Sequence, residues 1–359
     1  MLCGRLSTLT PGHLVGQFAV DNPTPLAFEA LALTDEETRP VLVLVAKATY
    51  TLGEHGLHLA HEQLPVNAAG EFWGVPGESS YRHEPEVALT KVATDVVLLG
   101  HAYAPARGTT ETLVALQIGP LKKAVRVVGE RTWFRSLGHV SMTKPQPFER
   151  MPLTWERAFG GWDKSHEDAK KHAFEPRNPV GVGFRASPRH FQEGLRLPNL
   201  EVPEQPLREF GQSVPPTGFG FTSPEWQPRA ALGGTHDEAW RKTRKPRWPR
   251  DFDRRFFNAA PSGQVAPGYL RGDEAVVIAN ASPRGRLAFQ LPGIPPPQVT
   301  AVVAGEEDVH PGMRLDTVIL DTDTHQVLLL WRAVLPLCNG PHDVRALAVR
   351  AEGLPATTL

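Results

Sequence analysis

Val41-Leu-Val-Leu-Val-Ala-Lys-Ala-Thr-Tyr-Thr-Leu52 is the stretch that decides the fold class. It begins as a continuous apolar run, as a strand covered on both faces does, and then alternates. Lys47, Thr49 and Thr51 share one face of the extended chain, and the residues between them share the other. The stretch therefore predicts a long, largely buried β-strand.

The composition of the whole chain also favours β-structure. The 359 residues include 35 prolines and 32 glycines, and 41% are hydrophobic. Interior prolines oppose a mostly helical protein, while the apolar content suffices for a core. The 38 basic and 39 acidic residues nearly balance, so no global field attracts nucleic acid or an anionic membrane.

Further strands are predicted on both sides of a different middle region. Their ranges are 92–99, 112–118, 122–128, 274–280, 285–290, 299–303, 314–320 and 326–332. Turns are expected at Gly119-Pro120 and at residues 321–325. Short helices are expected at 152–159, at 165–172 with Ser165 as the N-cap, and at 235–243.

The middle region, residues 141–270, holds 17 of the 35 prolines and five of the eight tryptophans. Tryptophan favours an ordered region over a disordered one. We expect a mainly β protein with a sandwich-like scaffold from residues 1–140 and 271–359, crossed by a long loop-rich insertion with a few short helices. Two separate β domains are the alternative.

The sequence predicts a cytoplasmic protein. No run reaches the roughly 18 apolar residues of a membrane helix. The N-terminus lacks the pattern of a signal peptide. Cys3 and Cys338 are the two cysteines, which is too few for a disulfide framework.

Signals for catalysis or metal binding are weak. The chain has no nucleophile elbow and no phosphate-binding loop. His55, His58 and His61 would point to alternate faces of a strand, whereas Asp321, Asp323 and His325 would share one. We therefore predict no catalytic, cofactor or metal residue. A hydrolase or metal enzyme stays an alternative if His101, Asp95 and Glu84, or the 321–325 group, converge in a cleft.

The basic stretch Trp240-Arg-Lys-Thr-Arg-Lys-Pro-Arg-Trp-Pro-Arg250 could contact nucleic acid through stacked bases and phosphates. Two aspartates and three aromatic residues follow it closely, and its prolines break any recognition helix. Arginines stacked on aromatic neighbours, or an acidic protein partner, explain it better. Exposed tryptophans would also suit a carbohydrate- or envelope-binding module.

A series of short motifs carries more information in its order than any member does alone. The series runs Asn22-Pro-Thr-Pro25, Val45-Ala-Lys-Ala-Thr49, Lys91-x-Ala-Thr-Asp-Val96, Gly100-His-Ala-Tyr-Ala-Pro105, Gly129-Glu-Arg-Thr-Trp133, Trp155-Glu-Arg-Ala-Phe-Gly-Gly161, Asn178-Pro-Val-Gly-Val-Gly183, Leu197-Pro-Asn-Leu-Glu201, Pro216-Thr-Gly-Phe-Gly220, Trp226-Gln-Pro-Arg229, Gly234-Thr-His-Asp237 and Asp251-Phe-Asp-Arg-Arg-Phe-Phe-Asn-Ala-Ala-Pro261.

Over about residues 15–335 this order resembles a bacterial family of domains of unknown function encoded in type VI secretion clusters. The resemblance implies a non-enzymatic adaptor or chaperone. Its partner would be a PAAR-type or other effector, loaded onto the VgrG spike. Aromatic and arginine side chains of the middle region are the candidate partner contacts, because both types are frequent at interaction hot spots; a purely structural role is the alternative. The candidates are Trp155, Arg157, Trp226, Arg229, Trp240, Trp248 and Arg254.

Overall fold

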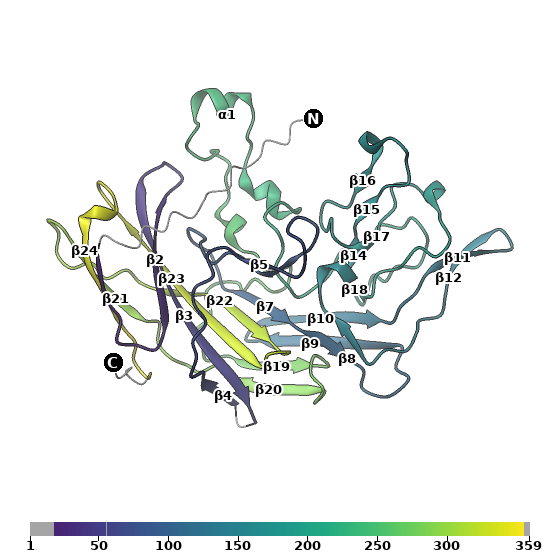
Figure 1. Ribbon diagram of the computed structural model, residues 1–359, viewed down its shortest axis with the longest axis horizontal. Helices are drawn as coiled ribbons and strands as arrows, with labels where there is room; N and C mark the ends of the chain where they lie inside the picture. Colours follow the sequence, from purple (N-terminus) through teal and green to yellow (C-terminus); the bar gives the residue numbers. More distant parts are fainter. Residues whose placement is uncertain (1–17, 55, 355–359) are drawn as a thin grey trace.

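The computed structural model describes residues 18–354 except residue 55. The protein is mainly β, as the sequence predicts, and its strands form several sheets (Figure 1). Cys3 and His55 lie outside the described residues. Within them, Cys338 is exposed and unpaired, and no helix is long and apolar enough to cross a membrane.

The central sheet joins the two ends of the chain. Its order is β2 (Ala27–Thr34), β3 (Pro40–Gly53), β23 (Gln326–Pro336), β22 (Arg314–Asp321) and β7 (Asp95–Leu99), with β4 (Gly56–Leu59) also paired to β3. β3 and β23 pair antiparallel from Val41↔Pro336 to Thr51↔Gln326, whereas β22 and β7 pair parallel. The strand predicted at 41–52 is thus an inner strand of this sheet.

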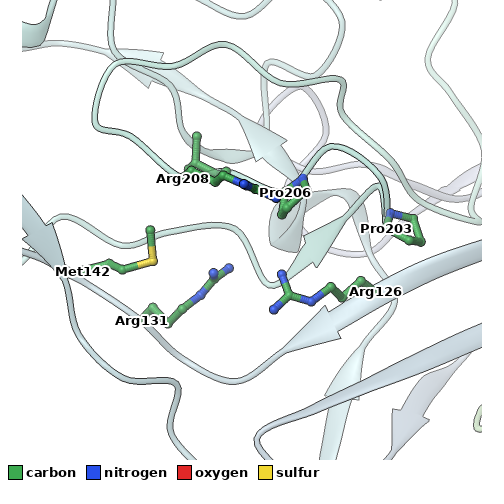
Figure 2. Close-up of a pocket in the computed structure, with 7 residues that line it drawn as sticks. Arg126, Arg131, Met142, Pro203, Pro206 and Arg208 are labelled. Carbon is green, nitrogen blue, oxygen red and sulfur yellow. The ribbon is translucent and has the colours of Figure 1, made fainter.

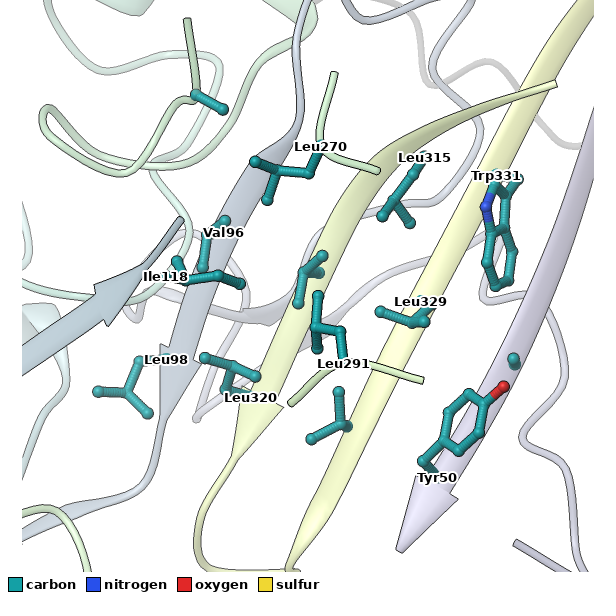
Figure 3. Packing of buried hydrophobic residues seen from close by; sticks show 14 of the residues in the cluster. Tyr50, Val96, Leu98, Ile118, Leu270, Leu291, Leu315, Leu320, Leu329 and Trp331 are labelled. Atoms are coloured by element: carbon teal, nitrogen blue, oxygen red, sulfur yellow. The ribbon is translucent and has the colours of Figure 1, made fainter. Parts of the chain in front are cut away.

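Two further sheets cover one face of the central sheet. One has the order β18 (Leu200–Glu201), β10 (Leu121–Val128), β9 (Glu111–Ile118), β19 (Ala275–Ala279) and β20 (Arg286–Gln290). The other has the order β1 (Ala19–Asp21), β24 (Val344–Arg350) and β21 (Gln298–Val303). Buried side chains from all three sheets form one core, in which Ile118 lies beside Val96, while Leu329 and Trp331 lie farther along it on β23 (Figure 3).

The opposite face of the central sheet is covered by irregular chain. Val41, Val43 and Val45 pack there against Phe221 and Ala259 of the middle region. Because both faces of β3 are covered, its first half reads as a continuous apolar run. The division of the chain at residues 140 and 270 stays a prediction.

Buried charges follow the apolar run on this second face. Lys47 is 3% exposed, and its ammonium lies 2.7 Å from a carboxylate oxygen of Glu86. The other Glu86 oxygen accepts the Asn67 backbone N–H at 2.7 Å. The ion pair therefore fixes the segment around Glu86 to the sheet.

The remaining elements are short. The strands are β5 (Glu71–Phe72), β6 (Tyr81–His83), β8 (His101–Tyr103), β11 (Trp133–Ser136), β12 (His139–Met142), β13 (Arg150–Pro152), β14 (Phe159–Gly160), β15 (Trp162–Asp163), β16 (Ala173–Phe174) and β17 (Val182–Gly183). The helical turns are η1 (Trp155–Arg157), η2 (Ala169–Lys171), η3 (Pro188–His190), η4 (Arg229–Gly233), η5 (Arg254–Phe257) and η6 (Pro341–Asp343), and α1 (Glu238–Thr243) is α-helical.

Each predicted strand range contains a strand, although the one expected at 92–99 begins at Asp95. The predicted helices are much shorter than expected. The segment 165–172 forms only η2, which is capped by Asp168 and not by Ser165. The Ser165 hydroxyl instead donates to the Asp163 carboxylate at 2.7 Å. The sequence did not predict β1, β2, β4, β18 and β24 of the three large sheets, nor the short strands outside them.

The Lys47–Glu86 pair gives a testable prediction. Lys47→Met leaves the buried Glu86 carboxylate without its cation, and we expect a loss of about 3–5 kcal/mol in the free energy of unfolding. Adding Glu86→Gln removes the orphaned charge and keeps an acceptor for Asn67, so part of that loss should return. Urea denaturation of both variants measures this, and a double variant less stable than Lys47→Met contradicts it.

Candidate functional site

A separate small core organises part of the middle region. Residues 129–142 and 159–214, here called the aromatic lobe, surround the buried side chains of Trp133, Phe159 and Leu197. In Figure 1 the lobe is the teal part at the upper right, beyond the end of β10. Its strands are two to four residues long, so its shape depends on side-chain contacts more than on sheet pairing.

Three of the predicted partner contacts lie inside the protein. Trp155 and Trp226 are 4% and 5% exposed and meet edge to face, with 5.7 Å between ring centroids. Arg229 is also buried, donates to the Phe256 carbonyl at 2.7 Å and pairs with Glu84. Their burial favours the structural role that the sequence left open.

The other predicted contacts are bound within the protein. Arg157 pairs with Glu130, and the Trp240 indole N–H donates to the Arg247 carbonyl at 2.9 Å. Trp248 packs against Phe252 and Phe257, whose rings also contact each other. Trp240 and Trp248 are only partly covered, so their contacts within the protein do not exclude a contact with a partner.

The basic stretch meets an acidic turn of the same chain. Arg254 lies 2.5 Å from a Glu36 carboxylate oxygen, and Arg244 pairs with Glu37. The backbone N–H of Trp248 donates to the Glu36 carbonyl at 3.0 Å. Intramolecular acidic partners therefore account for part of the positive charge of this stretch.

Among the side chains considered for catalysis, His101 meets Asp323 and not Asp95 or Glu84. His101 Nδ1 lies 2.7 Å from a carboxylate oxygen of Asp323, at a hollow of about 390 Å³ that Trp73 also lines. Arg150 lies 3.0 Å from His101 Nε2. If Nδ1–H donates to Asp323, then Nε2 accepts from Arg150, so neither ring nitrogen is free to act as a base.

Asp95 and Glu84 do not join His101. Asp95 is fully buried, and its carboxylate lies 2.7 Å from the Lys91 ammonium. Asp321 accepts the backbone N–H groups of Asp323 and Thr324, both at 3.0 Å, and so stabilises the turn between β22 and β23. Across residues 18–354 without 55, no three His, Cys, Asp or Glu side chains are grouped as metal ligands.

An exposed aromatic pair does lie on the lobe, but it consists of Trp162 and Phe174, neither of which the sequence predicted as a partner contact. Trp162 on β15 is 45% exposed and Phe174 on β16 is 42% exposed, and their rings stack at 4.5 Å. Gly160 and Gly161 precede Trp162 with φ values of 150° and 90°. A Cβ on Gly161 would lie 2.2 Å from the Gly181 carbonyl oxygen, so only glycine permits the turn that presents Trp162.

Three hollows open on the lobe and its junction with β10. The first has a volume of about 450 Å³, and Figure 2 shows Arg126 and Arg131 directed toward its centre. Both arginines bond the buried Glu201 carboxylate at 2.7 Å. Its other lining residues are Met142, Pro203, Pro206, Leu207 and Arg208.

The second and third hollows adjoin each other. They measure about 360 and 390 Å³, and Trp162 and Arg185 line both. Trp133, Phe210 and several glycines make the second largely apolar, and Arg196 adds a charge. Lys164, Ser165 and Gln192 complete the third. Every charged residue that lines the three hollows is basic.

Asp163 holds the third hollow in shape. Its carboxylate, 3% exposed, accepts from the Ser165 hydroxyl at 2.7 Å, the Ala186 N–H at 2.9 Å and His190 Nδ1 at 2.6 Å. Burial alone would raise the pKa of Asp163, but these hydrogen bonds hold it well below its usual range. The carboxylate therefore stays ionised and ties the segment 163–165 to the segment 186–190.

The fold is mainly β, with packed sheets and a loop-built lobe that carries three hollows. A model of a family described as an uncharacterized protein conserved in bacteria (DUF2169) matches residues 37–332. The match covers most of the chain, so the protein belongs to this bacterial family. No curated protein and no solved structure matches the chain.

The two kinds of tryptophan should differ in their effect on stability. Trp226→Ala empties a buried site and should cost about 3–5 kcal/mol of unfolding free energy. Trp162→Ala removes a ring that is nearly half exposed and should cost less than about 1 kcal/mol. Urea denaturation of the two variants measures this, and equal losses contradict the division into core and surface tryptophans.

Proposed function

We propose that the protein is a non-enzymatic, cytoplasmic adaptor or chaperone of type VI secretion. It binds a PAAR-type or other effector and assists its loading onto the VgrG spike. The secretion context comes from the ordered motifs given above. The observation that carries a binding role is the aromatic lobe, where the exposed Trp162–Phe174 pair adjoins hollows with basic linings.

The lobe has the properties of a protein-binding surface. Tryptophan and phenylalanine provide large contact areas and lose few rotatable bonds on binding. Arginine adds paired hydrogen bonds to carboxylates. The hollows are supported by a buried core and by the ionised Asp163, so little of the binding energy is lost in ordering loops.

The charge of the lining favours an acidic protein over a neutral sugar as the ligand. A carbohydrate site would use the same exposed Trp162, but it needs hydroxyl-binding acceptors as well as donors. The charged side chains that line the second and third hollows are Arg185, Arg196 and Lys164, which only donate. An acidic segment of a client supplies the matching acceptors.

Co-purification with a PAAR-type effector encoded in the same gene cluster tests the proposal. The unaltered chain should retain the effector, and Trp162→Ala with Phe174→Ala should reduce the retained amount by about tenfold or more, as loss of an aromatic anchor does. Both side chains are exposed, so the variant should keep the thermal unfolding midpoint of the parent.

Trp73→Ala is the matched control, because Trp73 is 37% exposed but lies at a hollow outside the aromatic lobe. It should retain the effector. Full retention by the Trp162 and Phe174 double variant removes the lobe from the proposal. No retention of any cluster-encoded effector by the unaltered chain overturns the adaptor role itself.

A further inference from the structure

The third hollow has a lining in which almost every polar group is a hydrogen-bond donor. Lys164 Nζ lies 5.8 Å from the centroid of the Trp162 ring. Arg185 lines the same hollow, together with Ser165, which carries a hydroxyl, and Gln192, which carries an amide. Of these groups, only the hydroxyl and the amide can also accept, and the hydroxyl already donates to Asp163.

Neither of the two cations of this hollow forms an ion pair within the described residues. Among residues 18–354 apart from 55, no carboxylate oxygen lies within 4.0 Å of the charged nitrogens of Lys164 or Arg185. Asp163 is the near acid, and it is already bonded to Ser165, Ala186 and His190. This distinguishes the third hollow from the first, where Glu201 bonds both Arg126 and Arg131.

Arg185 also has unused donor capacity. One Nη donates to the Phe184 carbonyl at 2.7 Å, whereas the buried Nε has no hydrogen-bond partner. Burial lowers the pKa of Arg185 while the Asp163 charge raises it, and an arginine stays protonated in either case. Because Nε itself is covered, an anion in the hollow would bind the guanidinium through its Nη groups, where a charge-assisted hydrogen bond is stronger than a neutral one.

The second hollow adjoins this site and adds apolar side chains to it. Trp162 and Arg185 line both hollows, and Trp133, Val182 and Phe210 line the second. A ligand that reaches both compartments would place a carboxylate near Lys164 and Arg185 and an apolar side chain beyond Trp162. Extended peptides carry such groups on neighbouring residues.

We propose that Lys164, Arg185 and Trp162 form a recognition site for an acidic peptide segment, in which a Glu or Asp side chain binds the two cations and an adjacent aromatic or aliphatic residue fills the second hollow. The site rests on the proposed adaptor function and names the chemistry of its client: an acidic segment with interspersed apolar residues. The two cations supply specificity, and the ring supplies contact area.

Fluorescence anisotropy with the purified full chain tests the site directly. The probe is a fluorescein-labelled nine-residue peptide of alternating Glu and Phe, and the comparison probe replaces each Glu by Gln. The acidic peptide should bind at least about tenfold more tightly than the neutral one, and its affinity should fall as salt is raised.

Lys164→Met with Arg185→Gln should weaken binding of the acidic peptide by about tenfold or more and leave the neutral peptide unaffected. Lys170→Met with Arg189→Gln is the matched control, because it removes the same charge from exposed positions outside the three hollows. Equal binding of both peptides, or equal loss in both double variants, overturns the site.

Competition with inorganic phosphate separates a peptide site from a site for small anions. Phosphate at millimolar concentration should displace the acidic peptide no better than chloride of equal ionic strength; selective displacement overturns the assignment to a peptide.

The effector assay keeps the two proposals apart. Acidic-peptide binding without retention of any effector supports the site and overturns the adaptor role. Effector retained equally by the parent and by Lys164→Met with Arg185→Gln leaves the adaptor role standing and overturns the site.

Discussion

The central sheet has two apolar faces, and both must be covered. Other sheets cover one of them, but irregular chain from the middle region covers Val41, Val43 and Val45 on the second. Buried charged groups of the sheet bond the covering chain. Lys47 pairs with Glu86, Arg332 of β23 donates to the carbonyls of Glu86 and Ala88 at 2.9 Å, and Asp95 of β7 accepts the Ala259 N–H at 2.8 Å. Losing either member of a pair would leave a buried charge uncompensated, so the cover and the sheet depend on each other.

Irregular chain can be buried only if its backbone groups find partners, and four buried amide side chains provide many of them. Asn178 donates to the carbonyls of Trp155 and Phe159, Asn199 to Val128, Asn258 to Ala93, and Gln264 to Val96 and Phe219. These side chains replace the ladder bonds that a sheet would supply. Asn178 and Asn199 thereby bond the chain on both sides of the turn that carries Trp162, and a supported turn of this kind loses less entropy in the binding role proposed for it.

The strands were predictable from sequence because each has a clear apolar period or run, as at 41–52. β2 was missed because Ala27–Thr34 is half-covered on both faces and gives no clean alternation. The candidate site was largely unpredictable. A tryptophan in a loop is equally compatible with the burial of Trp226 and the exposure of Trp162, and only contacts between distant segments decide between them. The local feature of the sequence that indicated the exposed turn was the glycine pair Gly160-Gly161 before Trp162. Similarly, no pattern in the sequence showed that His101 would meet Asp323 and not Asp95.

Amide hydrogen exchange on the isolated protein tests most directly whether the proline-rich middle region is a packed layer of the fold. We expect the Gly161, Val182 and Asn199 amides to exchange nearly as slowly as those of β3, because they donate within the buried network and open only with it. Fast exchange throughout residues 155–265, with β3 and β23 still protected, would contradict the account, since the second face of the sheet would then lack a stable cover.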